Sequence, residues 1–520
     1  MSGAARDLHQ RRFKKKLVLL REMLSRCEDT AFLQLVWSVN MLQSDFGTDV
    51  RRYLRYPPEA ATTQLDTPYA VFKWDLETLL IVLLTTPKYA PKLGVNLTYR
   101  CDLFETVAKS VNLLRSTEDH ESGASLSHGN VLMEMHRIGH RQFGWQRGFA
   151  TSERLYRFAY VYAQGGCAEY FAETRGLTIQ EFLQIGFLLF AQLHRYPWTK
   201  AVGVEKLGVD VALIHKSLPL LSRSLADMRT EAEALVRKAS RNGPVRIAYL
   251  PSALRRYPII TDPQFQTYIS PIPQLIMFRI TSGLYYDMCD GPQSLLAEAN
   301  NRFEEYARLV LKGFSPRFEV LPSQQYGGKK ARYDSPDILI RDGERIVAVL
   351  ECKATKLTYE AQFADNPIEQ ASRAYAQVVK GITQLWRFFS HVRRGIYIST
   401  PVAPDAHGIL LTMEAWMQMS GGLQQEAMAL ARKQLESDTE INDADMRPVI
   451  FCSMQDLSDV MFISKEDQFL VALGNAATEE YKGWSLREVR RATAGQEHAR
   501  EFPMDISALL PWWGKFRAEG

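Results

Sequence analysis

The spacing of apolar and polar residues changes along the chain. Apolar residues recur every three or four positions through most of 8–240, which is typical of amphipathic helices. Closely spaced prolines interrupt this pattern in 241–273, and short apolar stretches typical of strands follow from 318 onward. The pattern predicts four parts: a mainly helical region 1–240, a Pro-rich join 241–290, a mixed core 291–400, and an α/β extension 401–520. The predicted fold class is therefore α+β and multidomain.

The core and the extension each contain recognisable elements. Six elements are predicted in the core. They are a helix that begins at Pro292, three strands at 318–321, 336–341 and 345–353, a helix at 367–392 and a strand at 395–400. The extension is predicted to contain helices at 413–435, 457–473 and 486–493 and a strand at 449–453.

The two strands around Asp342-Gly343 form a predicted hairpin, because that dipeptide is a strong turn signal between apolar runs. From 346 to 350 the second strand is apolar on both faces, which is typical of a central strand in a covered sheet. It ends in Glu351-Cys352-Lys353. Side chains alternate along a strand, so Glu351 and Lys353 share one face while Cys352 points to the other. Burying this acid and base is costly unless they have partners or a function.

The register of the hairpin decides whether Asp337 joins these charges. A two-residue loop would place Asp337 on the face of Cys352, whereas a three-residue loop would place it with Glu351 and Lys353. We expect the three-residue loop, or a bulge with the same effect. Two carboxylates beside a lysine form a site for a hard divalent cation rather than for zinc.

Composition excludes several classes of protein. The 520 residues are 46% hydrophobic and 23% charged with a net charge of +4, which is ordinary for a globular protein. Six scattered cysteines without a CxxC pair argue against zinc ribbons and disulfide frameworks and favour the cytoplasm. No apolar run reaches the ~18 residues of a membrane span. The nucleotide-binding pattern GxxxxGK[ST] is absent, so we expect any NTP-driven motor to be a different chain.

Pro336-Asp337 followed by Glu351-Cys352-Lys353, set among these elements, resembles the PD-(D/E)xK nuclease superfamily. The resemblance covers about a fifth of the chain and implies a restriction-endonuclease-like core of order αβββαβ. It implies that Asp337, Glu351 and the backbone carbonyl of Cys352 bind Mg²⁺, with Mn²⁺ as a substitute, and that Lys353 acts on the attacking water. A glutamate on the first core helix is often part of such sites; Glu304 matches that place, with Glu305 as its rival.

Cations and amides near this motif are candidates for binding nucleic acid. On the helix 367–392 a stripe without acids contains Arg373, Gln377, Lys380, Gln384, Arg387 and His391. Gln377 matches the glutamine of a Gln-xxx-Tyr pattern found in some relatives, although Gly381 stands at the tyrosine place. A loop before Asp337 adds Lys329, Lys330 and Arg332. Residues 301–400 contain 16 Lys and Arg against 11 Asp and Glu, a local excess of +5.

The leading hypothesis is a Mg²⁺-dependent endonuclease that acts on nucleic acid, DNA rather than RNA, in a bacterial antiviral defence or restriction-like role. The alternative is a catalytically silent nuclease-fold module that binds nucleic acid or assembles a complex. For the protein as a whole we expect either a homo-oligomer or a partner subunit that supplies a sensor or motor. A third alternative, an incidental ion-paired hairpin in an interaction protein, leaves the matching flanking elements unexplained.

Other candidate sites have simpler explanations. His136 and His140 have the i, i+4 spacing of a metal clamp, but Arg137 replaces the glutamate of HExxH, so we expect structural histidines. Cys167 has no evident base and is expected to be a packed thiol. The basic helix 8–26 could contact phosphates, although a solvated face is the simpler interpretation.

Overall fold

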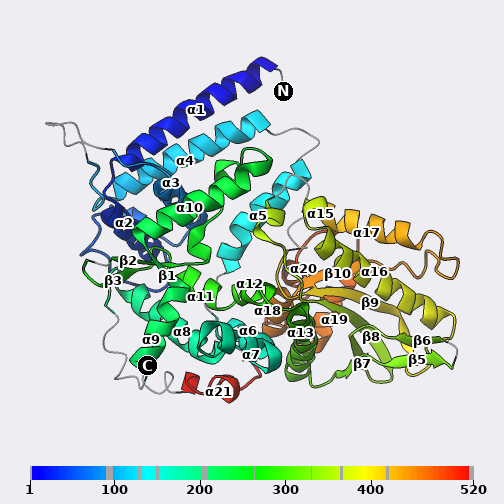
Figure 1. Ribbon diagram of the computed structural model, residues 1–520. Coiled ribbons are helices and arrows are strands. Elements are labelled where there is room, and N and C mark those ends of the chain that lie inside the picture. Colours follow the sequence, from blue (N-terminus) through cyan, green and yellow to red (C-terminus); the bar gives the residue numbers. More distant parts are fainter. Residues whose placement is uncertain are drawn as a thin grey trace. The chain divides into compact units, whose positions relative to one another are not determined.

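The computed structural model describes residues 3–89, 98–125, 131–147, 151–200, 209–262, 264–329, 331–363, 367–416 and 421–514 (Figure 1). They form two compact units. Unit 1 comprises Met1–Val131, Arg141–Ala159 and Ala168–Asp287, and unit 2 comprises Leu132–His140, Tyr160–Cys167 and Met288–Gly520. Most of the Pro-rich stretch 241–290 thus belongs to unit 1, while 291–400 and 401–520 share unit 2.

Unit 1 is mainly helical, as the spacing of its apolar residues predicts. Its helices are α1 (Gly3–Ser25), α2 (Asp29–Leu42), α3 (Lys73–Leu84), α4 (Phe104–Ser125), α8 (Ile179–Arg195), α9 (Val211–Leu221), α10 (Leu225–Ala239) and α11 (Gln274–Ile280). Four more helices contribute residues to both units: α5 (Val131–Arg147), α6 (Ser152–Tyr162), α7 (Gly165–Arg175) and α12 (Leu284–Cys289). Prolines fix φ and remove hydrogen-bond donors, so the Pro-rich stretch contributes only short pieces, including β2 (Ile259–Asp262) and β3 (Thr267–Ile269). With β1 (Ser222–Ser224) they form a sheet of order β1-β2-β3.

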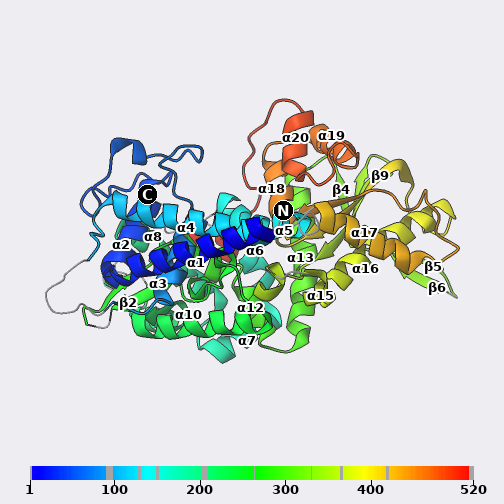
Figure 2. The ribbon, with the colours of Figure 1, turned by 90° about the horizontal axis from the view of Figure 1, so that it is seen from above.

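Helix α1 lies along α4 (Figures 1 and 2). Leu20 and Leu24 of α1 belong to the same apolar cluster as Val107, Val111 and Leu114 of α4. Burying such side chains contributes about 1.5–3 kcal/mol each relative to leaving them in water. One face of α1 is therefore held by unit 1, and the opposite face meets solvent.

Unit 2 is built on a five-stranded sheet of order β10-β9-β8-β7-β4. β4 pairs antiparallel with β7 and β7 with β8, whereas β8, β9 and β10 run parallel. Helices α16 and α17 pack on one face, and α13 and α18 on the other (Figure 1). The elements are α13 (Gln293–Phe314), β4 (Glu319–Pro322), β5 (Gln325–Gly328), β6 (Ala331–Asp334), β7 (Ile338–Asp342), β8 (Arg345–Lys353), α14 (Tyr359–Gln362), α15 (Pro367–Gln370), α16 (Ser372–Arg393), β9 (Val402–Thr412), α17 (Gly421–Leu435), β10 (Val449–Ser453), α18 (Met454–Phe462), α19 (Glu466–Ala476), α20 (Leu486–Thr493) and α21 (Ile506–Leu509).

The α+β class predicted from the sequence is confirmed, but several predicted elements are wrong. The strand expected at 395–400 begins instead at Val402. Gly395 adopts φ +70°, and the amides of Ile396 and Tyr397 donate to the carbonyl of His391, so this stretch closes α16 instead of extending as a strand. The loop expected before Asp337 contains the β5–β6 hairpin.

Two of the predicted helices also differ from the structure. The helix expected at 457–473 is divided into α18 and α19. The helix expected at 413–435 begins only at Gly421 in α17, and residues 417–420 lie outside the described part of the chain.

No single helix within the described ranges combines the length and apolar composition needed to cross a membrane. The helices α7 and α8 pass that test only when taken together across a 68° bend.

The two histidines of α5 meet edge to face within unit 2. Their ring centroids lie 4.4 Å apart, and His136 is buried with neither ring nitrogen hydrogen-bonded. Burial, reinforced by Arg137, lowers the pKa of His136 to about 4. The structure therefore places His136 as a neutral packed ring.

This burial predicts a pH-dependent loss of stability. Between about pH 6.5 and 4 the unfolded chain binds a proton at His136 that the folded chain does not, so the free energy of unfolding should fall as the pH falls, by up to ~1.4 kcal/mol per pH unit. A His136→Phe variant keeps a ring but cannot titrate. In urea unfolding its midpoint should decline less steeply over this window than that of the wild type. Parallel declines would contradict the neutral state of His136.

Candidate active site

The β7–β8 hairpin contains a bulge that aligns its acidic residues. Asp342 pairs with Arg345, so the loop holds only Gly343 and Glu344, and the expected three-residue loop is not formed. Between Ile340 and Arg341 the register shifts, because Val347 on β8 is inserted without a partner. The alternative expectation, a bulge with the same effect, is what the structure contains.

The shifted register places Asp337 beside the end of β8. Ile338 pairs with Leu350, so Asp337, one residue earlier, stands opposite Glu351. The Oδ2 atom of Asp337 accepts a hydrogen bond of 2.7 Å from the backbone N–H of Cys352. This bond leaves Oδ1 of the half-buried Asp337 without a hydrogen bond to the described chain.

Glu351 is the most deeply buried carboxylate of this group, with 1% of its surface exposed. Its Oε1 atom accepts a 2.6 Å hydrogen bond from Nζ of Lys353, which lies on the same strand face. Oε2 is buried and has no hydrogen-bond partner in the described part of the chain. An unpartnered buried carboxylate oxygen is costly, and its presence at a strand end is typical of a site that binds something.

Helix α13 supplies a third carboxylate. Asn300 donates from Nδ2 to Oε1 of Glu304 at 2.6 Å, and its Oδ1 atom accepts a 3.0 Å hydrogen bond from the N–H of Ala354. Asn300 therefore ties α13 to the end of β8. Glu304 is half-buried, whereas its rival Glu305 is exposed and lies 3.5 Å from the hydroxyl of Tyr160. Glu304, not Glu305, faces the other acids.

The pKa shifts show that the charges of Glu304, Glu351, Asp337 and Lys353 interact with one another. Burial and then the negative charges of Asp337 and Glu351 raise the pKa of Glu304 to about 8. Burial also raises the pKa of Glu351 to about 7, in spite of Lys353 beside it. For Asp337, burial raises the pKa against the opposing hydrogen bond from Cys352. Burial acts to lower the pKa of Lys353, but Glu351 and Asp337 outweigh it, so the net shift is upward.

Helix α16 covers the site at a glycine. A Cβ atom placed on Gly381 would lie 2.5 Å from Cδ1 of Leu410 and 3.2 Å from both Cγ of Glu351 and Cε of Lys353. The helix can approach Glu351 and Lys353 this closely because residue 381 has no side chain. A tyrosine at this position, as the Gln-xxx-Tyr pattern would have, does not fit this packing.

The stripe on α16 is only partly available to a ligand. Arg373, Gln377 and Lys380 are exposed, and the charge of Lys380 acts on both Asp337 and Glu351. Arg387 is exposed but lies 3.8 Å from Asp438, and Gln384 is half-buried.

His391, at the end of the stripe, does not face solvent as expected. It is buried, bonded at 2.8 Å to the hydroxyl of Tyr326, and packed on the ring of Tyr333. Aromatic packing of the β5–β6 hairpin thus takes this position out of the stripe.

The cations predicted in the loop before Asp337 lie on or beside that hairpin. Lys329 and Arg332 are exposed, and Lys330 falls outside the described residues. The hairpin packs through Tyr326 and Tyr333 on the C-terminal end of α16, whereas Glu351 and Lys353 contact Gly381 in the middle of that helix. The structure therefore does not join these cations to the carboxylates by any contact within the described residues.

The carboxylate oxygens of this site suit a hard cation only if a main-chain carbonyl and water complete the ligand set. The described residues contain no ready-made cluster of three His, Cys, Asp or Glu side chains for a metal. Free oxygens of Asp337 and Glu351 together with a main-chain carbonyl and water would instead make up the ligand set that Mg²⁺ prefers. The unpartnered Oε2 of Glu351 fits that role.

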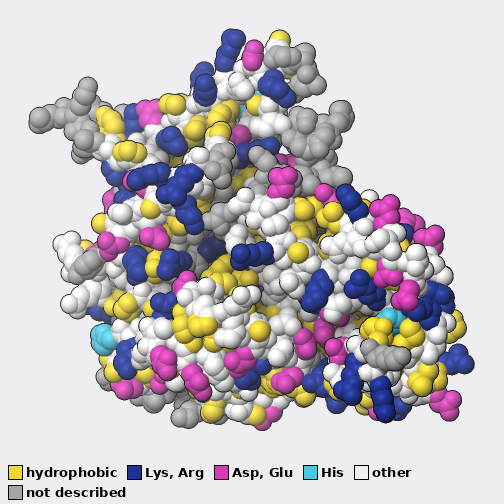
Figure 3. Space-filling view, turned by 45° about the vertical axis from the view of Figure 1, so that its right-hand side comes forward, with side chains coloured by type: hydrophobic (Ala, Val, Ile, Leu, Met, Phe, Trp, Pro, Cys, Tyr) yellow, Lys and Arg dark blue, Asp and Glu magenta, His cyan; other side chains and the backbone are white. Residues whose placement is uncertain are grey.

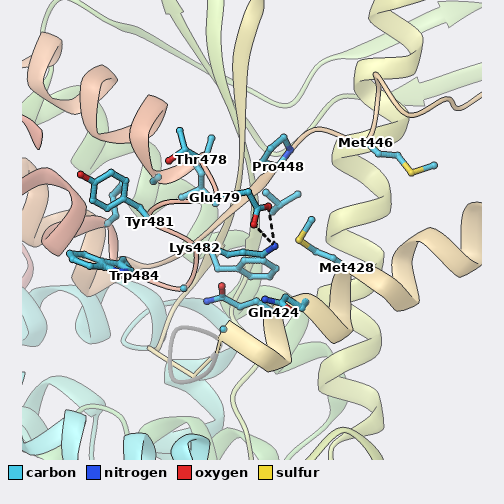
Figure 4. A pocket seen from close by; sticks show the side chains of 18 of the residues that line it. Gln424, Met428, Met446, Pro448, Thr478, Glu479, Tyr481, Lys482 and Trp484 are labelled. Atoms are coloured by element: carbon cyan, nitrogen blue, oxygen red, sulfur yellow. Dashed lines mark hydrogen bonds and ion pairs between the residues drawn. The ribbon is translucent and has the colours of Figure 1, made fainter. Parts of the chain in front are cut away.

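A cavity elsewhere in unit 2 contains none of these acids. It has a volume of about 370 Å³ and lies between α17, β10 and the segment 476–486 (Figure 4). Its carboxylate, Glu479, accepts hydrogen bonds of 3.0 and 2.9 Å from Lys482. The thioethers of Met428 and Met446 line the same cavity. Its charges are paired, so its chemistry differs from that of the carboxylate site.

Comparison of the chain with family models, with curated proteins and with solved structures finds no match. Assignment of a function therefore depends on the geometry of the site.

Sequence reasoning missed Asn300 and the packing role of Gly381. Asn300 lies four residues before Glu304, one helical turn away on the same face, and this spacing could have indicated it. The role of Gly381 depends on how closely α16 approaches the sheet, which no local pattern encodes.

The close approach of α16 can be tested by adding single methyl groups. Alanine at Gly381 gains about 1 kcal/mol of helix propensity but crowds Leu410, Glu351 and Lys353, and overpacking costs about 1–3 kcal/mol. Gly381→Ala should therefore be neutral or destabilising in thermal unfolding. The matched control Gly474→Ala on α19, where a Cβ meets nothing within 4 Å, should stabilise the protein. Equal stabilisation by both substitutions would contradict the packing.

Proposed function

We propose that this chain is a metal-dependent nuclease of the PD-(D/E)xK type that hydrolyses phosphodiester bonds in nucleic acid, DNA rather than RNA. The proposal depends above all on one observation: Asp337, Glu351 and Lys353 converge at adjoining ends of β7 and β8, and a buried oxygen of Glu351 has no partner. Once the β5–β6 hairpin and the short helices α14 and α15 are set aside, the order α13, β4, β7, β8, α16, β9 supports the proposal, because it follows the order that the sequence resemblance implies.

The carboxylates would hold the metal. Asp337, Glu351 and the carbonyl oxygen of Cys352 are the ligands that the resemblance implies, and the oxygen atoms left free by the hydrogen bonds of the site fit that assignment. A bound Mg²⁺ would polarise the scissile phosphate and lower the pKa of a water molecule.

Lys353 provides the positive charge of the site. Its Nζ atom lies 2.6 Å from Oε1 of Glu351, and Gly381 of α16 packs close to its Cε atom. From this position Lys353 orients the attacking water and offsets the charge that develops on the phosphate oxygens.

The remaining residues position the site and the substrate. Asn300 holds Glu304 and the backbone of Ala354 at the same time, so it fixes α13 against the end of β8. Lys380 and Gln377 are exposed on α16 within about one turn of Gly381, where they can contact the phosphates of a bound strand.

Purified protein incubated with plasmid, single-stranded DNA and RNA, each with and without Mg²⁺ or Mn²⁺, tests this function. Cleavage of DNA that needs a divalent cation is the expected result. Binding of nucleic acid without cleavage in either metal would favour the catalytically silent module instead.

The carboxylates should be essential for cleavage and dispensable for folding. Asp337→Asn and Glu351→Gln keep the shape of each side chain and a hydrogen-bond acceptor for Cys352 or Lys353, but they remove the charge that a cation requires. Each variant should lose cleavage by on the order of 10³-fold or more and unfold at a temperature close to that of the wild type. The matched controls Asp334→Asn and Glu305→Gln, at exposed positions nearby, should cleave normally. A wild-type rate in either site variant would remove the metal site from the proposal.

Lys353 should affect turnover more than binding. One ammonium that acts on the transition state contributes on the order of 10²–10³ in kcat, whereas many cations share the binding of the backbone. Lys353→Met should therefore lower kcat by about that factor and change KM by less than ~3-fold. Lys312→Met, an exposed lysine on α13, is the control. Equal losses in binding and turnover would identify Lys353 as a docking charge only.

A further inference from the structure

The solvent face of α1 has an unusual charge balance. The helix contains seven Lys and Arg (Arg6, Arg11, Arg12, Lys14, Lys15, Lys16 and Arg21) against two acids (Asp7 and Glu22), so its net charge of +5 exceeds the +4 of the whole chain. Lys and Arg side chains gather over α1 at the top of the space-filling view (Figure 3). An ordinary wet helix face mixes charges of both signs.

None of these seven cations has a hydrogen-bond or ion-pair partner within the described chain. One of the two acids of α1 is already occupied, since Glu22 pairs with Arg26 at 2.5 Å. Three of the four acids of the neighbouring α4 are engaged elsewhere: Glu105 binds Lys109 at 2.7 Å, Glu118 binds Arg141 at 2.7 Å, and Glu121 accepts a 2.9 Å bond from the N–H of Ile247. The fourth, Asp119, is exposed and acts on His120 in opposition to Arg12 and Lys16 of α1, so it offsets one charge at most. The positive charge of α1 is therefore left facing solvent.

The cations lie along the outer face of the helix. Arg11, Lys14, Lys15 and Arg21 are exposed. At about 100° per residue, Arg11 and Lys15 lie opposite the buried Leu20, and Lys14 and Arg21 lie together on one flank of that outer face. From Arg11 to Arg21 they span about 15 Å of helix, a length over which a duplex presents roughly nine phosphate charges.

We propose that this face of α1 binds the phosphate backbone of double-stranded nucleic acid without reading its sequence. This inference rests on the proposed function in one respect, which is that the bound duplex would be the substrate of the nuclease. No aromatic side chain is exposed on the face, so it has nothing on which unpaired bases could stack.

The chemistry of the face favours a duplex over an anionic membrane. A helix that lies in a membrane interface inserts a continuous apolar stripe. On α1 that stripe is already used against α4, and the exposed apolar residues Leu8, Val18 and Leu19 are interspersed with cations.

Neutralising four of the cations tests the surface. A variant with Arg11, Lys14, Lys15 and Arg21 all replaced by glutamine keeps good helix formers at exposed positions. Binding of a 30-base-pair duplex would be measured with EDTA present at several salt concentrations. The variant should bind at least ~10-fold more weakly at 0.1 M salt, and its log-log salt slope should be shallower by about 2–4 units.

A matched control separates the local surface from the overall charge. Replacing Lys216, Arg237, Lys312 and Lys433 by glutamine removes the same charge from exposed positions on other helices. This control should keep wild-type affinity and slope. Equal losses in both variants, or no loss in the α1 variant, would overturn the proposal.

A single substitution should strengthen binding, so that the test does not depend on loss alone. Val18 is 63% exposed and lies between Lys14 and Arg21 on the same face. Val18→Lys adds a cation there and should tighten duplex binding several-fold, whereas unchanged or weaker binding would count against the surface.

Two further measurements separate this inference from its alternatives. Loss of binding to phosphatidylserine vesicles in the α1 variant, with duplex binding unchanged, would overturn the proposal in favour of a membrane surface. Binding without divalent metal is independent of cleavage, so a wild type that binds through α1 but cuts nothing would contradict the nuclease and support the surface.

Discussion

The arrangement of unit 2 depends on the burial of one carboxylate. Glu351 lies at the end of a central strand with almost no exposed surface, and Lys353 neutralises only one of its oxygens. Truncating one partner of such a buried pair, with no side chain of similar shape left to accept or donate its hydrogen bond, typically costs about 3–5 kcal/mol. The surrounding structure holds this pair in place. Gly381 allows α16 to pack directly on Glu351 and Lys353, and Asn300 bonds α13 to Ala354, the residue after Lys353. The second oxygen of Glu351 is nevertheless left without a partner, at a cost to stability that a binding role would explain.

The sequence predicts the faces of the hairpin better than its details. Alternation places Glu351 and Lys353 together, and the structure agrees. The bulge at Val347 could be anticipated only as an alternative, because it depends on pairing across the sheet. The strand expected at 395–400 does not form. Gly395 ends α16, and the local hydrogen bonds that close this helix outweigh the β propensity of the stretch. His391 looked like part of a polar stripe, but tertiary packing against Tyr326 overrides helical spacing there.

Buried charges in unit 1 are paired, whereas the surface cations of α1 are not, in the part of the chain that the structure describes. In the interior of unit 1, Glu77 binds Arg255 at 2.9 Å and Asp75 binds Arg115 at 2.8 Å, so buried acids are compensated by arginines. On α1 no such compensation exists within the described residues. Unpaired surface cations stabilise a fold little, and mutual repulsion makes their clustering slightly unfavourable. A long row of them is better explained by an external anion than by folding.

The bulge in the hairpin has a consequence for how this site can change in evolution. Successive residues of a strand alternate between faces, so the two acids stay together only if the pairing between them keeps the same parity. Loss of Val347, or gain of one residue in the Gly343-Glu344 turn, would send Asp337 to the opposite face without touching any ligand. Gain or loss of two residues would leave it in place. Any homologous hairpin should therefore differ in length by even numbers, or balance an odd change by gaining or losing a bulge.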